Sequence, residues 1–163
     1  MDKKNKEKLY KFYIKHIDTS LENKNYFESS WLSYVLIEDR LVSLLMQTGG
    51  NKATTNKKGK KANKPIQMLG PKIVELEKRL KTDALLKKEL KTDLLDSLKD
   101  WKDDRNNLMH SMADGKLTVN DIQTKIEKLA TDGRDIARNI AATSRRVKKK
   151  NKKSKLKLAG KRK

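Results

Sequence analysis

The chain has 163 residues, with 41 lysines and arginines against 21 acidic residues, and it contains no cysteine. This length suits one domain with a single core, and the lack of cysteine excludes disulfides, thiolate metal sites and cysteine nucleophiles. No apolar run reaches the roughly 18 to 20 residues that a membrane span needs, and residues 1–17 lack a signal-like stretch. We therefore expect a soluble, cytoplasmic protein that makes no contact with a membrane.

The composition favours helices throughout. The chain has only two prolines and seven glycines, whereas Leu, Lys, Asp and Glu are abundant. We predict an all-α fold, an up-and-down bundle of four to five helices that spans residues 1–147. Residues 148–163 are predicted to form a basic, disordered tail.

The first two predicted helices carry much of the apolar content. Apolar residues at helical spacing predict a short helix over 5–17, and 22–47 is the most apolar helix of the chain. A helix that is apolar around most of its girth is central, or is covered by a partner subunit. One stripe of helix 22–47 contains Phe27, Trp31, Tyr34, Val35, Leu41, Val42 and Leu45, while Leu32, Leu36, Ile37 and Leu44 lie on its other sides.

A polar and basic segment, residues 48–65, follows this helix, and we predict that it is a mobile loop. The turn Leu69-Gly70-Pro71 then opens another helix, with Pro71 at the first position, where a missing amide hydrogen costs nothing. This helix is expected to end near Lys81. Its buried face is expected to contain Ile73, Val74, Leu76 and Leu80.

The carboxyl-terminal half predicts two long helices. Asp83 is suited to cap a helix over 84–112, and Asp114-Gly115 predicts a turn after it. The last helix is expected to run over 119–147, weakened but not broken by Gly133. The buried stripe of helix 84–112 is predicted to contain Leu86, Leu90, Leu94, Leu98 and Trp101.

Positive charge is concentrated in three segments. Residues 145–163 hold twelve basic residues and no acid, 48–65 hold six and none, and 1–17 hold six against two acids. This leaves 17 of the 41 basic and 19 of the 21 acidic residues in 18–47 and 66–144. The folded part is therefore nearly neutral, and the basic arms are suited to attract RNA or ribosomes, unless they serve solubility alone. The candidate RNA-binding residues are Arg145, Arg146, Lys148, Lys149, Lys150, Lys152 and Lys153.

Two charged residues occupy positions that the helical pattern reserves for apolar ones. The buried stripe of helix 84–112 continues from Trp101 through Arg105 to Leu108, and Glu38 lies within the stripe of the second helix. Burying a single charge without a partner is too costly, so we predict that Glu38 pairs with Arg105. Both tryptophans, Trp31 and Trp101, are predicted to lie in the core.

The alternative is that Arg105 extends past its neighbours to solvent and that His110 is an ordinary surface residue at a helix end. On a continuous helix Arg105 and His110 are about 140° apart, whereas Asn106 and His110 share a face. Arg105 and His110 can converge if the helix bends, if Arg105 uses its length, or if two copies of the helix meet across a dimer.

The segment Arg105-Asn106-Asn107-Leu108-Met109-His110 resembles the motif of the HEPN superfamily, in which an Arg is followed after a short spacer by a His. A polar residue often follows the Arg, as Asn106 does here. The context supports the resemblance: the host helix follows an apolar helix with Ile37-Glu38-Asp39-Arg40-Leu41, and Leu69-Gly70-Pro71-Lys72-Ile73 resembles the entry to an intervening helix. The similarity covers residues 20–145 in pattern, and the basic loop and tail depart from the family.

The resemblance implies a metal-independent endoribonuclease whose composite site forms where two copies bring their motifs together. His110 is then the general base or acid, because an imidazole exchanges protons near neutral pH. Arg105, supported by Glu38, holds the scissile phosphate and stabilises charge in the transition state, and Asn106 orients His110 or a phosphate oxygen. The nucleophile is the 2′-hydroxyl of single-stranded RNA, so neither a metal nor another cofactor is expected and DNA should survive.

The sequence is therefore compatible with three functions. The first is such a ribonuclease, a homodimer through the apolar helices, in a toxin, antiviral-defence or abortive-infection role and with a possible protein antitoxin or regulatory partner. The second is a non-catalytic RNA- or ribosome-binding helical protein that uses its basic arms. The third is an assembly partner whose helix 22–47 docks another protein. His16 has only Asp18 nearby and is expected to be a surface residue instead of a metal ligand.

Overall fold

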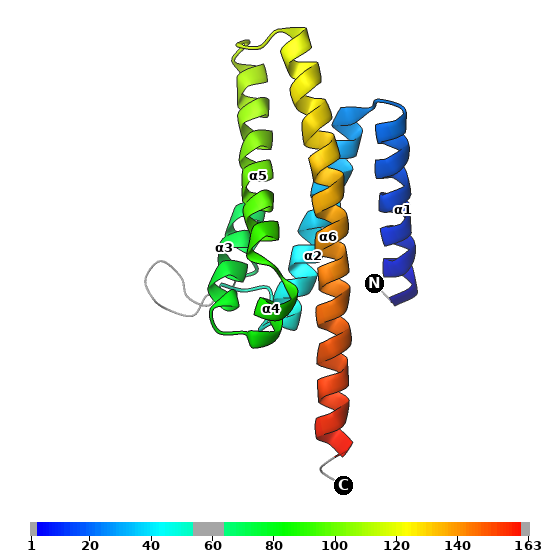
Figure 1. Cartoon of the computed structure of the whole chain (residues 1–163), viewed down its shortest axis with the longest axis vertical. Helices are drawn as coiled ribbons and strands as arrows, with labels where there is room; N and C mark the ends of the chain where they lie inside the picture. The colour runs from blue at the N-terminus through cyan, green and yellow to red at the C-terminus, as the bar shows by residue number, and fades with distance from the viewer. Residues whose placement is uncertain (1–2, 54–63, 161–163) are drawn as a thin grey trace. The chain divides into compact units, whose positions relative to one another are not determined.

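The computed structural model describes residues 3–53 and 64–160, with side chains for 5–53, 64–154 and 156. This part of the chain forms helices without strands, so the predicted all-α class is confirmed, and α2 and α6 pack together in a bundle. The six helices are α1 (Lys3–Glu22), α2 (Tyr26–Gln47), α3 (Leu69–Leu80), α4 (Ala84–Glu89), α5 (Thr92–Ala113) and α6 (Val119–Gly160), labelled in Figure 1. None of these helices is both long enough and apolar enough to span a bilayer.

The chain divides into two compact units. Unit 1 comprises Met1–Ile37 and Asp96–Asn139, and unit 2 comprises Glu38–Leu95 and Ile140–Lys163. The helices α2, α5 and α6 each contribute residues to both units. The sequence pattern, which predicted one domain over residues 1–147, contains no signal for this division because no linker separates the units.

Unit 1 contains two antiparallel helical hairpins, which can be followed in Figure 1. In the first, a turn joins α1 to α2, and there the Lys24 backbone has φ 59° while the Asn25 amide donates to the Ser20 carbonyl at 2.7 Å. In the second, the predicted turn at Asp114-Gly115 joins α5 to α6, and Gly115 has φ 64°. A positive φ at this position favours glycine.

The buried face of α2 differs from the predicted one. Phe27 and Trp31 are 50% and 59% exposed, so the prediction that Trp31 lies in the core is wrong. In a sequence pattern serine is read as polar and therefore as exposed. Serine is also small, however, and lets helices approach closely. Ser29, for example, donates a hydrogen bond to the Ile17 carbonyl at 3.3 Å. The buried residues of α2 are Ser29, Ser30, Ser33, Leu36, Ile37, Leu41, Leu44 and Leu45.

Within unit 1, α5 and α6 meet at Trp101 and Gly133. Trp101 is 3% exposed, which confirms its predicted place in the core, and its indole nitrogen donates to the Leu129 carbonyl at 2.8 Å. A Cβ at Gly133 would lie 2.9 Å from two atoms of the Trp101 ring. Gly133 is therefore needed for the close approach of the two helices.

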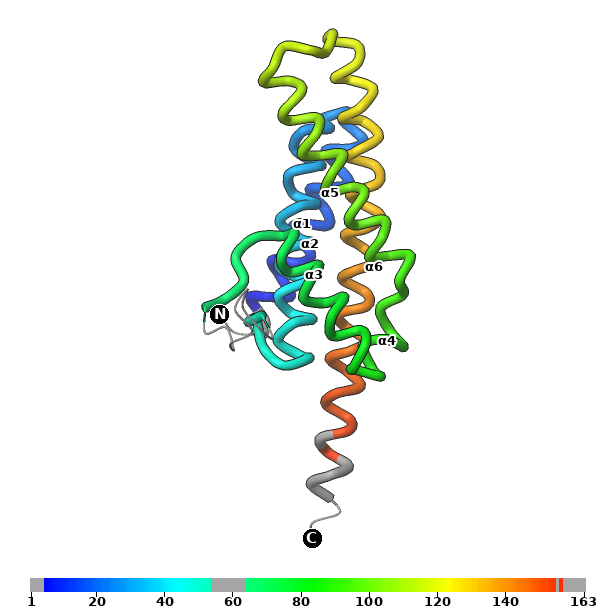
Figure 2. The backbone as a smooth tube through the Cα atoms, turned by 90° about the vertical axis from the view of Figure 1, so that its left-hand side faces the viewer, coloured from blue at the N-terminus to red at the C-terminus, as the bar shows by residue number. Residues whose placement is uncertain are grey.

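The prediction of one continuous helix over 84–112 is wrong. In unit 2 the chain breaks at Leu90 and Lys91, so α4 and α5 are separate helices. As predicted, Asp83 caps the first of them, accepting a hydrogen bond from the Leu86 amide at 2.8 Å. After the break the buried stripe shifts by one position, to Leu95 instead of Leu94. The described part of the chain therefore has six helices instead of the predicted four or five. Figure 2 shows α3 and α4 in the part of the chain between the two long helices α2 and α5.

The face that α3 buries is partly charged. The helix begins at Leu69 after the N-cap Met68, so Pro71 lies inside the first turn instead of at the first position, where its missing amide hydrogen still costs nothing. Val74 is 49% exposed, so its predicted burial is wrong. The buried residues are Leu69, Lys72, Ile73, Glu75, Leu76 and Arg79.

Arg79 fixes the chain that follows α2. Its guanidinium donates to the carboxylate of Glu75, the carbonyls of Leu45, Gly50 and Lys52, and the hydroxyl of Thr48, at 2.7–3.2 Å. Gly49 and Gly50 have φ +125° and +99°, which other residues rarely adopt. Residues 48–52, at the start of the predicted loop 48–65, are thus held in place, and Lys52 forms a backbone bridge with Pro65. Residues 54–63 of the loop lie outside the described part of the chain.

Helix α6 does not end at Val147 as predicted, and residues 148–160 of the predicted disordered tail are helical. Val147 is fully buried, and one turn later the Asn151 amide donates to the Gln47 carbonyl at 3.0 Å. Lysine, leucine and alanine are good helix formers, and the segment holds no proline, so nothing local stops the helix. Residues 161–163 lie outside the described part.

Candidate functional site on helix α5

The predicted catalytic residues lie on the last turns of α5, within unit 1. Arg105 is half-buried, and its guanidinium carbon lies 4.5 Å from the centroid of the Tyr34 ring on α2. Asn106 and His110 are exposed. Helix α5 therefore presents one shielded cation and two accessible polar groups on neighbouring faces.

The position of Arg105 follows from the apolar stripe on which it lies. Its neighbours on that stripe, Trp101 and Leu108, are 3% and 4% exposed. A guanidinium at this position needs a partner, and the face of an aromatic ring attracts it by about 0.5–2 kcal/mol. Tyr34 therefore holds Arg105 in place while the residue stays partly exposed.

The structure gives Glu38 a different partner from the predicted Arg105. Within unit 2, the Glu38 carboxylate accepts a hydrogen bond from Lys72 at 2.6 Å, and Lys72 also donates to the Gln67 carbonyl at 2.5 Å. Lys72 is 3% exposed, so its ammonium needs these acceptors more than a half-exposed arginine does. The pair with Lys72 gives Glu38 a structural role in unit 2.

Helix α5 is continuous through the motif. It extends to Ala113, and the Asp114 amide donates to the His110 carbonyl at 2.9 Å, so the helix does not fray before His110. Arg105 is engaged by Tyr34 and is not extended toward His110. In one copy of the chain, therefore, Arg105 and His110 point in directions about 140° apart, whereas Asn106 and His110 share a face.

The cavities in the described part of unit 1 include two that none of the three motif residues lines. One of about 300 Å³ lies between α5 and α6 beside Asn107, Ser111 and Lys128. There, a hydrogen bond to Asp132 raises the pKa of Lys128. The other, of about 490 Å³, lies at the starts of α2 and α6. In its wall, a hydrogen bond to Glu127 raises the pKa of Tyr26.

The basic residues predicted to bind RNA fall into two groups. Arg146 and Lys150 are ion-paired with Glu89, which is 7% exposed, and Arg146 lies 3.0 Å from that carboxylate. The hydrogen bond from Lys150, together with Arg146, lowers the pKa of Glu89. The remaining members, Arg145, Lys148, Lys149, Lys152 and Lys153, are exposed along α6.

The exposed aromatic residues of α2 were missed as candidate functional residues. Phe27 and Trp31 were assigned to the core because aromatic residues at helical spacing usually are buried. Their spacing alone contains no signal that separates a buried stripe from an exposed one. The neighbouring serines, at Ser29, Ser30 and Ser33, were the available signal that another face of α2 packs closely.

The other histidine is a surface residue, as predicted. His16 is exposed, and its ring lies 4.1 Å from that of Phe12 on the same helix. Among the side chains that the structure describes, no three His, Asp or Glu residues come together as a metal site.

No protein-family model matches the sequence, and neither the curated proteins nor the solved structures contain a match. The function therefore has to be argued from the side chains of the site.

Proposed function

We propose that the chain is a metal-independent endoribonuclease that cuts single-stranded RNA at a composite site formed by two copies. One observation carries the proposal: the guanidinium of Arg105 is seated on Tyr34, and the amide of Asn106 and the imidazole of His110 are exposed beside it on the same helix. The resemblance of this segment to the HEPN motif supports the same assignment.

The three side chains match the chemistry of RNA cleavage. The His110 imidazole of one copy removes the proton from a ribose 2′-hydroxyl, and the 2′-oxygen attacks the adjacent phosphorus. Arg105 binds the phosphate oxygens and stabilises the charge that develops on them. The bond from phosphorus to the 5′-oxygen breaks, that oxygen takes up a proton, and a 2′,3′-cyclic phosphate remains. Asn106 shares a face with His110 and orients its ring.

Two copies are needed because of the direction of the side chains. On the continuous helix α5, Arg105 and His110 of one copy face different sides. In a twofold dimer, each Arg105 can face the His110 of the partner, because the same patch of both copies forms such an interface. Each dimer then contains two equivalent sites.

The first experiment measures cleavage without metal. A labelled single-stranded RNA is incubated with the full chain in EDTA, and the same sequence as DNA serves as the uncleavable substrate. Because general acid–base catalysis contributes roughly 10²- to 10⁴-fold, His110→Ala should lower the rate by at least about 100-fold. Arg105→Ala should have a comparable effect.

Matched controls exist in the same unit. His16→Ala removes the other, surface histidine, and Arg134→Ala removes a half-exposed arginine that pairs with Asp135 at 3.0 Å. Both control variants should cleave at the wild-type rate. Equal cleavage by wild type, Arg105→Ala and His110→Ala would refute the proposal.

A mixing experiment tests the composite site itself. Neither Arg105→Ala nor His110→Ala has an intact site as a homodimer, but a mixed dimer keeps one intact Arg105–His110 pair. Equal amounts of the two variants should therefore recover about a quarter of the wild-type rate, since half of the dimers are mixed and each has one of two sites. No recovery would show that each site uses residues of one copy alone.

A toxin or defence role, with an antitoxin or regulatory partner, is part of the same proposal. It is supported by the resemblance only. Expression of the chain should arrest the growth of a bacterial host, and His110→Ala should relieve the arrest. Growth arrest that persists in the variant would separate toxicity from RNA cleavage.

A second candidate, non-catalytic binding of RNA or ribosomes, is favoured by the exposed lysines of α6. Lys148, Lys149, Lys152 and Lys153 form exposed pairs four residues apart, so they present positive charge along one stretch of helix. If they contact phosphates, replacing all four with Gln should reduce the salt dependence of RNA affinity, by about 0.7 in the log–log slope per lost contact with a single strand. An unchanged slope would assign these lysines to solubility.

A further inference from the structure

Three aromatic residues, Phe27, Trp31 and Tyr34, follow one another along α2 at helical spacing. Residues three and four apart lie on one face of a helix, so these side chains form a single row, here called the aromatic row. The rings of Trp31 and Tyr34 lie 6.3 Å apart and are inclined by only 24°. All three residues belong to unit 1.

Two of the three residues of the aromatic row, Phe27 and Trp31, are exposed although α2 has a well-buried face elsewhere. Phe27 is 50% and Trp31 59% exposed, whereas Leu36 and Ile37 on the same helix are at most 1% exposed. Grouped aromatic surface in water is a common mark of a binding site, whereas single exposed apolar residues are ordinary. The exposed rings of Phe27 and Trp31 are therefore a candidate binding surface.

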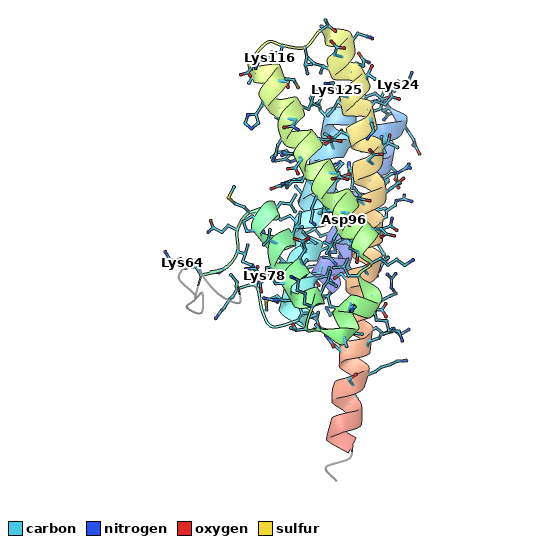
Figure 3. The ribbon with its side chains drawn as sticks, turned by 60° about the vertical axis from the view of Figure 1, so that its left-hand side comes forward. Lys24, Lys64, Lys78, Asp96, Lys116 and Lys125 are labelled. Atoms are coloured by element: carbon cyan, nitrogen blue, oxygen red, sulfur yellow. The ribbon has the colours of Figure 1, made fainter. Side chains whose placement is uncertain are left out.

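Positive charge lies at both ends of the aromatic row. At one end, Arg105 lies over Tyr34 at 4.5 Å. At the other end, Lys24 is exposed in the turn before α2, and Lys24 and Phe27 both line the cavity of about 490 Å³. Figure 3 shows that Lys24 and Lys125 lie toward the same end of unit 1.

We propose that the aromatic row is a stacking platform for the bases of single-stranded nucleic acid. Unpaired bases stack on aromatic side chains, and flanking cations contact the phosphates. Glu28, the acidic residue next to Phe27 in the sequence, is held by a hydrogen bond that its carboxylate accepts from Ser20 at 2.8 Å. An apolar protein surface docked on the row would instead cover Lys24 and Arg105 and remove their hydration without supplying negative charge.

The aromatic row also deepens the proposed function. A base stacked on Trp31 would place the neighbouring phosphate near Arg105, the residue that is proposed to hold the scissile phosphate. The row would thus select single strands, because the bases of a duplex are already stacked. Stacking does not require cleavage, so the two proposals can be tested separately.

The experiment uses single-stranded oligo(dT), which lacks the 2′-hydroxyl and is therefore not a substrate of the proposed reaction. The chain has only two tryptophans, and Trp101 is 3% exposed, so Trp31 is the one that a ligand or a soluble quencher can reach. Addition of oligo(dT) to the full chain should quench the Trp31 emission and protect it from acrylamide.

The affinity is measured in parallel by the anisotropy of labelled oligo(dT). Because loss of one base stack weakens binding substantially, Trp31→Ala should lower the affinity about 5- to 100-fold, and Trp31→Phe should retain part of it. The loss should be the same at every salt concentration, since Trp31 has no charge. Phe27→Ala should also weaken binding.

Phe12→Ala is the matched control. Phe12 is 50% exposed, as Phe27 is, but it lies on α1 against Tyr13 and His16. The affinity of the Phe12→Ala variant for oligo(dT) should equal that of the wild type. Equal affinities of Trp31→Ala and wild type would overturn the proposal, whatever the outcome of the RNA cleavage assay. It would also be overturned if the Trp31 emission depended on protein concentration but not on oligo(dT), because a second copy would then cover the row.

Discussion

The two units use their charged residues differently. Every charged side chain that is buried in the described part of the chain belongs to unit 2: Lys72, Glu75, Arg79 and Glu89. The buried polar residues of unit 1 are serines: Ser20, Ser29, Ser30 and Ser33. Unit 1 instead keeps its motif residues Asn106 and His110 at the surface.

This difference separates structural charges from those that can meet a ligand. A buried charge is tolerated only where hydrogen bonds and an opposite charge replace its water, and removal of one partner then leaves the other uncompensated. In unit 2 the Arg79 guanidinium has five acceptors for this purpose. Substitutions in unit 2 should therefore change stability, and substitutions at the surface of unit 1 should change binding or catalysis.

The largest effect is expected for Arg79→Ala. The change removes the guanidinium that pairs with the buried carboxylate of Glu75 and donates to three carbonyls, which should lower the free energy of unfolding by about 3–5 kcal/mol. Urea unfolding measures the loss, and hydrogen exchange should be fastest in α3 and residues 48–52. The control Arg134→Ala, at a half-exposed pair, should cost less than about 1 kcal/mol. Similar values for the two variants would contradict the contrast between the units.

Gly133→Ala tests whether unit 1 depends on close packing instead of charge. The new methyl group would lie 2.9 Å from the Trp101 ring, and crowding of this kind costs about 1–3 kcal/mol, partly offset by the roughly 1 kcal/mol by which alanine favours a helix over glycine. Thermal unfolding should show a lower midpoint, with a change in Trp101 fluorescence. Thr131→Ala, two residues away and exposed, should leave the midpoint nearly unchanged. If Gly133→Ala were more stable than the wild type, α5 would be able to move away from α6 and make room for the methyl group.

A smaller effect that depends on pH is expected for Glu89→Gln. Because Lys150 and Arg146 lower the pKa of Glu89 below its ordinary 4.5, its charge stabilises the folded state above about pH 4.5, and this stabilisation is lost as the pH falls toward the lowered pKa. Since both cations are half-exposed, we expect the variant to lose about 1 kcal/mol at pH 7. The difference between the unfolding midpoints of the wild type and Glu89→Gln should shrink as the pH falls from 5 to about 3. A gap independent of pH would exclude the ion pair as its cause.

The smallest effect on stability is expected for Asn106→Ala and His110→Ala. Both side chains are exposed, so each change should alter the free energy of unfolding by less than about 0.5 kcal/mol while it lowers RNA cleavage. Chemical denaturation and the cleavage assay on the same preparations provide the comparison. A large loss of stability in either variant would assign the residue to the fold instead of to the site.

Features encoded by adjacent residues could be predicted from the sequence. The cap at Asp83 and the turn at Gly115 depend on side chains or backbone freedom within one turn, and both are confirmed. The break at Leu90 could not be predicted, because Leu and Lys favour a helix and the break is accompanied by contacts of Glu89 with α6. A local pattern contains no information on such distant partners.

The same limit applies to the candidate site. The apolar stripe correctly indicated that Arg105 is partly shielded, but it could not identify Tyr34 as its partner. The burial of Lys72 and Arg79 on α3 was not predicted. Their spacing of seven residues, on the face of Ile73 and Leu76, was an available signal. Sequence pattern thus located the unusual charges better than their contacts.

The contacts of Arg79 have a practical consequence for protein engineering. The Lys52 and Pro65 backbones form a bridge, and Arg79 fixes the carbonyls of Gly50 and Lys52, so these two backbone positions of unit 2 are clamped side by side. A fluorescent protein or affinity tag inserted between these clamped positions would enter and leave at neighbouring, fixed points. Such an internal fusion site would leave both termini of the chain unmodified.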